Sequence, residues 1–303
     1  MVRPDNGAVE AVGAGAKYHL PGKERRLIAP LRSGVIADID AASALLRPLF
    51  KRARKFGLTR PRLLACVPTD ARAEERAALI EAASRAGAGQ VALTPEPLAA
   101  AIGAGMDVAL DYAQMILDVG DGVTDIAVIR SGSLVSTSAI RTAFSDLKRS
   151  ISRLAADRCE IDLHQREAER LIREVGIAHY ARSNRTISSL VPLIAAGDDL
   201  TSGLMRRARL SRQDVIAAMD PVLSEIVGFV VNTVRALPAD ISCEVIESGI
   251  RLTGGGALLV GLRDLLARET GIEVRTARDP LRAVIDGARQ MLGIGVATQL
   301  WQN

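Results

Sequence analysis

Short apolar runs alternate with longer amphipathic stretches along most of the chain. The run at 62–68 predicts a buried β-strand, and 71–88 predicts an amphipathic helix because its apolar residues recur at helical spacing. A second strand is predicted at 90–95. Pro97 then predicts a helix over 96–107, since the first turn of a helix tolerates a missing N–H. This alternation indicates an α/β fold.

The middle of the chain predicts antiparallel strands followed by helices. Residues 115–141 hold three apolar runs separated by short glycine-containing turns, which predicts a three-stranded meander. The stretches 145–178 and 212–237 are mostly helical in pattern, with an irregular segment or a short-strand hairpin at 197–211 between them.

The last part of the chain returns to the α/β alternation. Residues 249–269 predict a strand, a glycine turn and a helix, followed by a strand at 272–277 and a helix over 280–292. The most apolar late helix, 222–237, carries Asn232 and Arg235, so we expect no membrane-spanning segment.

Composition narrows the class of protein. With 303 residues, 48% hydrophobic and 24% charged, the chain is an ordinary folded protein with room for about two domains. Aromatic residues make up only 3% of the chain, which argues against surfaces that stack nucleic-acid bases. The net charge of +4 is a modest excess over a long chain and indicates no basic tail that would bind a polyanion. We therefore expect no nucleic-acid partner. Three scattered cysteines without a CxxC pair favour a reducing, cytosolic setting.

A glycine-containing turn links the first two strands of the meander. Glycine allows backbone N–H groups to converge on a phosphate, and a carboxylate such as Asp118 can organise a hydrated Mg²⁺. The segment 118–124 therefore fits a phosphate-binding hairpin. A Gly-Asp-Gly between strands is more often a plain tight turn, so the turn by itself does not establish a phosphate site.

A second glycine turn, 253–257, lies between a predicted strand and a predicted helix. Three consecutive glycines there allow close approach of the backbone to a nucleotide, or merely close packing. The turn matches neither the Walker A pattern nor GxGxxG.

The two turns belong to a longer pattern that resembles the MreB family of bacterial actins. The segments that carry the resemblance, in order and spacing, are 34–40 (GVIADID), 67–79 (VPTDARAEERAAL), 96–105 (EPLAAAIGAG), 117–129 (LDVGDGVTDIAVI), 249–262 (GIRLTGGGALLVGL) and 279–292 (DPLRAVIDGARQML). The resemblance implies an actin-like fold of two related RNase H-like domains with a nucleotide cleft between them. It also implies ATP-dependent filaments that organise cell shape and cell-wall synthesis at the inner membrane.

The resemblance also implies domain boundaries. The first domain is expected over 1–141 and 278–303, with a small subdomain at about 1–62. The second is expected over 142–277, with a small subdomain at about 171–235.

Site residues follow from the resemblance position by position. ATP and Mg²⁺ are the implied cofactors, with Asp118 holding the metal through water and Glu96 positioning the attacking water. Without the resemblance, Glu96 is equally well explained as a carboxylate at a helix start. The residues assigned to nucleotide binding are Asp118, Gly120, Asp121, Gly122, Val123, Thr124, Gly254, Gly255, Gly256, Ala257 and Glu169.

The chain departs from the family pattern in several places. The strand, DxGT turn and strand that begin MreB-like proteins are missing, so the first domain is expected to be incomplete at its N-terminus. Ala143, Phe144 and Ser145 replace the family's Gly-Gly-Asp, and Ile172 replaces an adenine-side Lys. These changes indicate either an altered binding geometry or a paralogue without ATPase activity. A slow ATPase is expected if the nucleotide site functions.

A basic stretch precedes two apolar residues where MreB-like proteins carry a membrane-facing loop. Phe56 and Leu58 are the membrane-facing candidates, after Lys51, Arg52, Arg54 and Lys55. A solvated helix end is the alternative. His19, His164 and His179 show no metal-ligand spacing.

The expected partners are those of the family. They are further copies of the chain in homopolymer filaments, an intact MreB homologue, and cell-wall elongation proteins of the membrane, with the protein cytoplasmic and peripheral to the inner membrane. Three alternatives remain: a non-hydrolysing actin-like scaffold, a magnetosome-type actin homologue, and a small-molecule kinase of the same superfamily, for which no extra segment supplies a substrate pocket.

Overall fold

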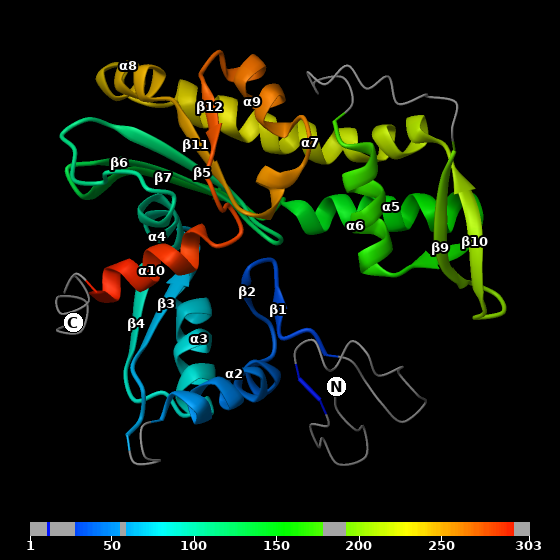
Figure 1. Cartoon of the computed structure of the whole chain (residues 1–303), viewed down its shortest axis with the longest axis horizontal. Helices are drawn as coiled ribbons and strands as arrows, with labels where there is room; N and C mark the ends of the chain where they lie inside the picture. Colours follow the sequence, from blue (N-terminus) through cyan, green and yellow to red (C-terminus); the bar gives the residue numbers. More distant parts are fainter. Residues whose placement is uncertain (1–10, 13–27, 55–58, 178–191, 294–303) are drawn as a thin grey trace. The chain divides into compact units, whose positions relative to one another are not determined.

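A computed structural model describes residues 11–12, 28–54, 59–177 and 192–293 (Figure 1). The chain divides into two compact units, one formed by Met1–Pro95 with Met291–Asn303 and the other by Glu96–Gln290. These compact units are not the two domains implied by the family resemblance, and the boundaries of those domains stay a prediction. Within the described residues, no helix is both long enough and apolar enough to cross a bilayer.

The smaller unit contains a βαβ arrangement that confirms the predicted strand, helix and strand. Strands β3 (Leu63–Val67) and β4 (Val91–Pro95) pair in parallel, and α3 (Ala73–Ala86) connects them. The helix ends at Gly87, which adopts the left-handed conformation that favours glycine.

Helix α2 (Ile39–Ala53) packs against α3 in the same unit. It begins at Asp38, whose carboxylate accepts a hydrogen bond from the backbone N–H of Ala41. Phe50 of α2 lies in an apolar cluster with the end of α3. A hairpin of β1 (Leu31–Arg32) and β2 (Val35–Ile36) precedes α2.

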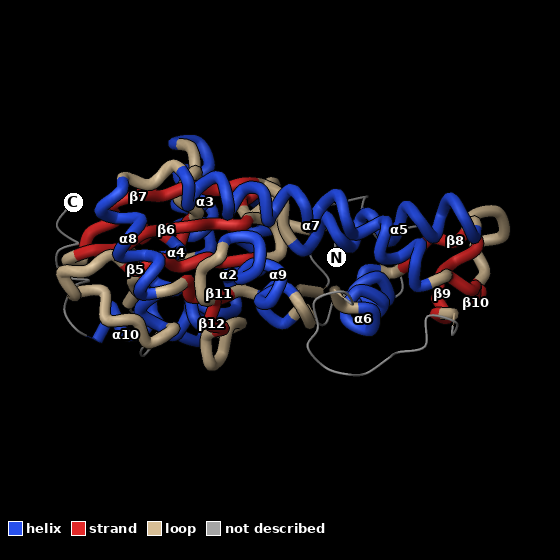
Figure 2. Tube along the Cα trace, turned by 90° about the horizontal axis from the view of Figure 1, so that it is seen from above, coloured by secondary structure: helices blue, strands red, loops and turns tan. Residues whose placement is uncertain are grey.

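The larger unit is built on a five-stranded sheet. Its order is β12-β11-β5-β6-β7, with β11 parallel to both β12 and β5, and with β5, β6 and β7 forming the predicted antiparallel meander (Figure 2). The strands are β5 (Gln114–Val119), β6 (Thr124–Arg130), β7 (Ser133–Ile140), β11 (Ile250–Thr253) and β12 (Val274–Thr276). Strands β5 and β6 are buried along almost their whole length, which explains their continuous apolar runs.

Helices and a smaller sheet complete this unit. Its helices are α4 (Glu96–Gly103), α5 (Phe144–Cys159), α6 (Gln165–Val175), α7 (Arg212–Arg235), α8 (Ala239–Ser248), the 3-10 helix η1 (Gly255–Leu258), α9 (Leu262–Thr270) and α10 (Ala283–Gly293). The smaller sheet has the order β10-β9-β8, with β8 (Ile161–Leu163), β9 (Leu193–Asp199) and β10 (Met205–Leu210). Helices α5 and α7 lie side by side, and one continuous apolar core joins them to the large sheet (Figure 2).

The structure differs from the prediction at three places. The helical stretch 145–178 is interrupted by β8, because α5 ends at Glu160 in a left-handed conformation and the next residues alternate between buried and exposed. Helix α8 was not predicted. The helix expected directly after the second glycine turn begins only at Leu262, since η1 intervenes.

Helices α4 and α10 cross at two glycines. A Cβ on Gly103 would lie 1.8 Å from the carbonyl oxygen of Ala283, and a Cβ on Gly287 would lie 1.8 Å from the carbonyl oxygen of Ala99. Both contacts are with backbone, which cannot move aside cheaply. The two helices therefore approach closely only because these positions lack side chains.

Substituting Gly287→Ala is expected to destabilise the protein by about 1–3 kcal/mol, since one methyl group would overpack the crossing. Gly228→Ala is the matched control: Gly228 lies in α7, and a Cβ there would meet nothing within 4 Å. The control is expected to be neutral or stabilising, because alanine favours helix. Urea unfolding of both variants measures the difference in stability. Equal stabilities would contradict the close packing of the two helices at Gly287.

Candidate functional site

The first glycine turn joins β5 to β6 in the large sheet. Val119 and Thr124 face each other in the antiparallel register, and the backbone N–H of Gly120 donates to the carbonyl of Val123 at 2.9 Å. The Thr124 hydroxyl donates to the carbonyl of Thr142 at 2.7 Å. These bonds close a short hairpin at the end of two buried strands. Its residues Asp121 and Gly122 are not buried.

The second glycine turn lies directly against the first. Because β11 runs beside β5 in parallel, Thr253 is paired with Asp118. Gly254 has φ +83°, and a Cβ there would lie 2.3 Å from Asp118 Oδ1 and 2.4 Å from the Val119 carbonyl oxygen. A Cβ on Gly256 would lie 2.3 Å from Val119 Cγ1. The structure thus brings together two turns that are far apart in the sequence, and Gly254 and Gly256 are what allows it.

The other residues of the second turn lie at its outer side. Gly255 and Ala257 belong to η1 and are only half-buried, and a Cβ on Gly255 would be in ordinary contact with Leu281, at 3.5 Å.

Three carboxyl groups lie near this junction. Asp118 and Asp125 are 6% and 2% exposed and stand opposite each other in neighbouring strands, and Glu96 begins α4. Burial, followed by the charges of Glu96 and Asp125, raises the pKa of Asp118 to about 8. Burial, followed by the charge of Asp125, also raises the pKa of Glu96. The junction therefore carries crowded negative charge that a cation would relieve.

Sequence reasoning missed Asp125 as a member of this group. The available signal was a single carboxylate within the apolar run of β6. An isolated acidic residue in a buried strand is costly unless it has a partner or a function.

The start of α5 is attached to the first turn. The backbone N–H groups of Phe144 and Ser145 donate to the carbonyls of Gly120 at 3.2 Å and Asp121 at 2.7 Å. Lys148, one turn further on, places its Nζ 2.5 Å from Asp121 Oδ1. Sequence reasoning also missed Lys148, because a single lysine on an amphipathic helix carries no distinctive pattern.

Glu169 is linked to the same region through side chains. It forms an ion pair with Arg173 at 2.9 Å, and the Arg173 guanidinium lies 5.4 Å from the centre of the Phe144 ring. Lys148 Nζ lies 5.8 Å from that ring. Ile172, which stands where the resemblance implies a lysine, is 0% exposed and lies in the apolar core.

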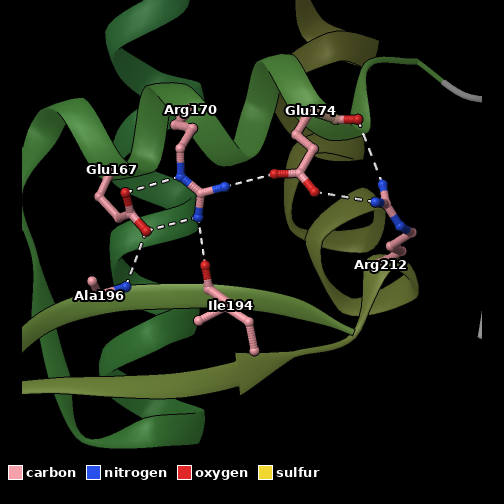
Figure 3. A network of polar contacts seen from close by, with 6 residues as sticks. All are labelled: Glu167, Arg170, Glu174, Ile194, Ala196 and Arg212. Carbon is pink, nitrogen blue, oxygen red and sulfur yellow. Dashed lines mark hydrogen bonds and ion pairs between the residues drawn. The ribbon is translucent and has the colours of Figure 1, made fainter. Parts of the chain in front are cut away.

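Helix α6, which carries Glu169 and Arg173, is held in place by a network of charged side chains (Figure 3). Arg170 bridges Glu167 and Glu174 and donates to the carbonyl of Ile194 on β9, while Arg212 of α7 pairs with Glu174 at 3.2 Å. The hydrogen bonds that Arg170 donates to the Glu167 carboxylate lower the pKa of Glu167 and raise the pKa of Arg170. The network fixes α6 against β9 and α7.

The membrane-facing candidates Phe56 and Leu58 lie outside the described residues, as do Lys55, His19 and His179. Lys51 and Arg52 are exposed in the last turn of α2. His164 precedes α6 and lies 3.6 Å from a carboxylate oxygen of Asp198. Within the described residues, no group of three His, Cys, Asp or Glu side chains is arranged to hold a metal ion by itself.

Known proteins of similar sequence indicate the family of this chain. A family model described as MreB/Mbl protein matches residues 1–297. The chain is 35% identical to the cell shape-determining protein MreB of Escherichia coli strain K12 over 290 residues, which cover 94% of this chain and 82% of that protein. It is 33% identical to the cell shape-determining protein Mbl of Bacillus subtilis strain 168 over 291 residues, covering 95% and 86%.

Solved structures agree with the family match. MreB5 of Spiroplasma citri bound to AMPPNP superposes with a TM-score of 0.84 at 27% identity, covering 98% of this chain and 89% of that one. A MamK double helical filament gives a TM-score of 0.67 at 19% identity, covering 87% and 80%, which speaks for the fold alone. The chain therefore has the actin-like fold. It belongs to the MreB/Mbl family of bacterial actins.

Replacing Asp118 by Asn is expected to stabilise the nucleotide-free protein at pH 8. An acid whose pKa rises on folding, here from 3.8 to about 8, holds its proton more tightly in the folded state. It therefore costs stability as pH rises through that window, and the cost persists above it. Asn removes this cost, so we expect a gain of at least about 1.4 kcal/mol at pH 8, the free energy of one pKa unit, and a smaller gain at pH 5.

Urea unfolding at the two pH values measures these gains, with exposed Asp157→Asn as the control for loss of a charge. A gain that is equal at pH 5 and pH 8, or a loss at pH 8, would contradict the raised pKa of the Asp118 carboxyl group.

Proposed function

We propose that this protein is a filament-forming bacterial actin that binds ATP with Mg²⁺ and helps organise cell shape and cell-wall synthesis. The observation that carries the proposal is the direct contact between the two glycine turns beside a buried carboxylate, at Gly254 and Asp118. Support also comes from the relatives: MreB and Mbl are named cell shape-determining proteins, MreB5 was crystallised with AMPPNP and with ADP, and MamK forms a double helical filament.

In this proposal the phosphates bind at the first turn. Asp121, Gly122 and Val123 offer backbone N–H groups. The Gly120 N–H and the Thr124 hydroxyl are engaged with the carbonyls of Val123 and Thr142, which keeps the hairpin closed. The second turn, Gly254 to Ala257, lies on the adenosine side together with Glu169. Because Gly254 has no side chain, the two turns can lie on one surface.

The donor set fits a hydrated Mg²⁺ better than a metal held by protein alone. Mg²⁺ usually keeps several waters and takes one or two carboxylates together with substrate phosphates. Asp118 is the residue that would hold it, through water, and its pKa is raised first by burial and then by the charges of Glu96 and Asp125. The bound ion would neutralise the phosphate charge.

Glu96 is the proposed catalytic residue. Its side chain begins α4 near Asp118, and burial raises its pKa, which makes it a better acceptor for a proton of the attacking water. Glu96 is a weak base, so we expect hydrolysis to be slow and to be coupled to filament turnover.

The proposal extends to location and partners. The filaments would be homopolymers, or copolymers with another MreB homologue, on the cytoplasmic side of the inner membrane, where they would meet cell-wall elongation proteins. Phe56 and Leu58 would contact the membrane. In the proposed filament subunit the domain boundaries are those implied by the family, with 1–141 and 278–303 forming one domain and 142–277 the other.

A second candidate function is a non-hydrolysing scaffold. The observation that favours it is the position of Phe144 and Ile172, because a bulky ring and a fully buried apolar side chain stand where the resemblance implies glycine and lysine. Such a scaffold would join filaments of another MreB homologue without hydrolysing nucleotide.

Mg·ATP titration by calorimetry and ATP-dependent pelleting test the proposal. Wild type is expected to bind saturably and to pellet with ATP. Glu96→Gln is expected to keep the binding but to lower hydrolysis by about a hundredfold or more, as loss of a general base does. Glu74→Gln, an exposed carboxylate of α3, is the control.

If folded wild-type protein shows no saturable binding, the ATP-driven filament is contradicted. Binding and ATP-dependent pelleting without hydrolysis in wild type would favour the scaffold.

A further inference from the structure

We propose that Lys148 is a phosphate-binding residue of this nucleotide site. The inference rests on the proposed function, and it assigns a role to a residue that the family resemblance does not mark. Lys148 projects from α5 onto the first glycine turn, and its Nζ lies 2.5 Å from Asp121 Oδ1.

The burial of the two partners is unequal. The side chain of Lys148 is 15% exposed, whereas that of Asp121 is 70% exposed. The lysine stem is therefore covered, and its ammonium group is held at the surface of the hairpin. A partly desolvated ammonium is costly unless anions lie close to it. The exposed Asp121 carboxylate supplies one such anion, and a phosphate at the hairpin would supply more.

The surroundings fix the direction of Lys148. The Phe144 ring, itself 5% exposed, lies 5.8 Å from Nζ. The backbone N–H groups of Phe144 and Ser145 tie the same helix start to the hairpin carbonyls of Gly120 and Asp121. Lys148 and the hairpin are therefore held together, so the ammonium is kept within reach of a phosphate bound at the hairpin.

The chemistry of the group suits phosphate. An ammonium group has three N–H donors, and one of them is directed at Asp121 Oδ1. Converging backbone amides beside a lysine point charge are a common way to hold phosphate oxygens. Arg173, 5.4 Å from the centre of the same ring, is paired with Glu169. Lys148 contacts the hairpin directly, at Asp121.

Two variants separate this role from a purely structural ion pair. Lys148→Met and Asp121→Asn each break the same contact. If the pair only held the hairpin in shape, both would weaken nucleotide binding. If Lys148 binds phosphate, the two variants act in opposite directions, because Asp121→Asn leaves the ammonium free for the phosphate.

The test is calorimetry with Mg·ATP and Mg·ADP, and competition with adenosine, on the full chain. We expect Lys148→Met to weaken ATP and ADP binding about tenfold or more, the range of a charge-assisted hydrogen bond, with adenosine changed less than about twofold. Asp121→Asn, which keeps the backbone N–H of that position, should raise ATP affinity, and Lys148→Arg should restore most of the loss. The control is Arg153→Met, an exposed cation on the same helix.

Each outcome decides the inference. Unchanged ATP affinity in Lys148→Met overturns it, and so does an equal loss for ATP and adenosine, or an equal loss in Lys148→Met and Asp121→Asn. A wild-type protein that binds no nucleotide contradicts the proposed function instead, so the two failures are distinguishable. If Lys148→Met does not fold, the direction of the change in Asp121→Asn still decides.

Discussion

The burial of carboxyl groups at the junction of two glycine turns, with the repulsion between them added, is the physical constraint on which the candidate site depends. Asp118 and Asp125 are buried opposite each other in the sheet, and Glu96 adds a third carboxyl group. A folded protein keeps such an arrangement at a cost in stability, because like charges in a buried site disfavour one another. The cost is understandable where a cation and a polyphosphate are to be bound, since the bound cation reverses the local electrostatics.

The rest of the larger unit serves to hold that junction. The sheet order β12-β11-β5-β6-β7 places the end of β11 beside the end of β5, so the second turn meets the first. Gly254 and Gly256 allow contact distances that a side chain would prevent. Helix α5 ties the hairpin from one side. The charged network around Arg170 fixes α6, and with it Arg173 against the Phe144 ring. The chain belongs to the MreB/Mbl family and has the actin-like fold, and the proposed nucleotide site lies at this junction.

Local pattern was sufficient for much of the fold. The meander and the βαβ arrangement follow from apolar periodicity, and the glycine turns from composition, so these elements could be predicted. The crossing at Gly103 and Gly287, the strand β8 and the participation of Asp125 and Lys148 could not, because each depends on which segments meet in space. The turn 118–124 was ambiguous by itself. The contact of Gly254 with Asp118 joins residues that are far apart in the sequence, so local sequence patterns cannot predict it.

The most direct test of the central claim is the pKa of the Asp118 carboxyl group, followed by NMR of the side-chain carbon against pH in nucleotide-free protein. We expect a midpoint near pH 8, with Asp118→Asn confirming the assignment of the signal. With Mg·ADP bound, the midpoint is expected to fall well below 8, because the cation stabilises the carboxylate. A midpoint close to the ordinary value of 3.8 in the nucleotide-free protein would contradict the account.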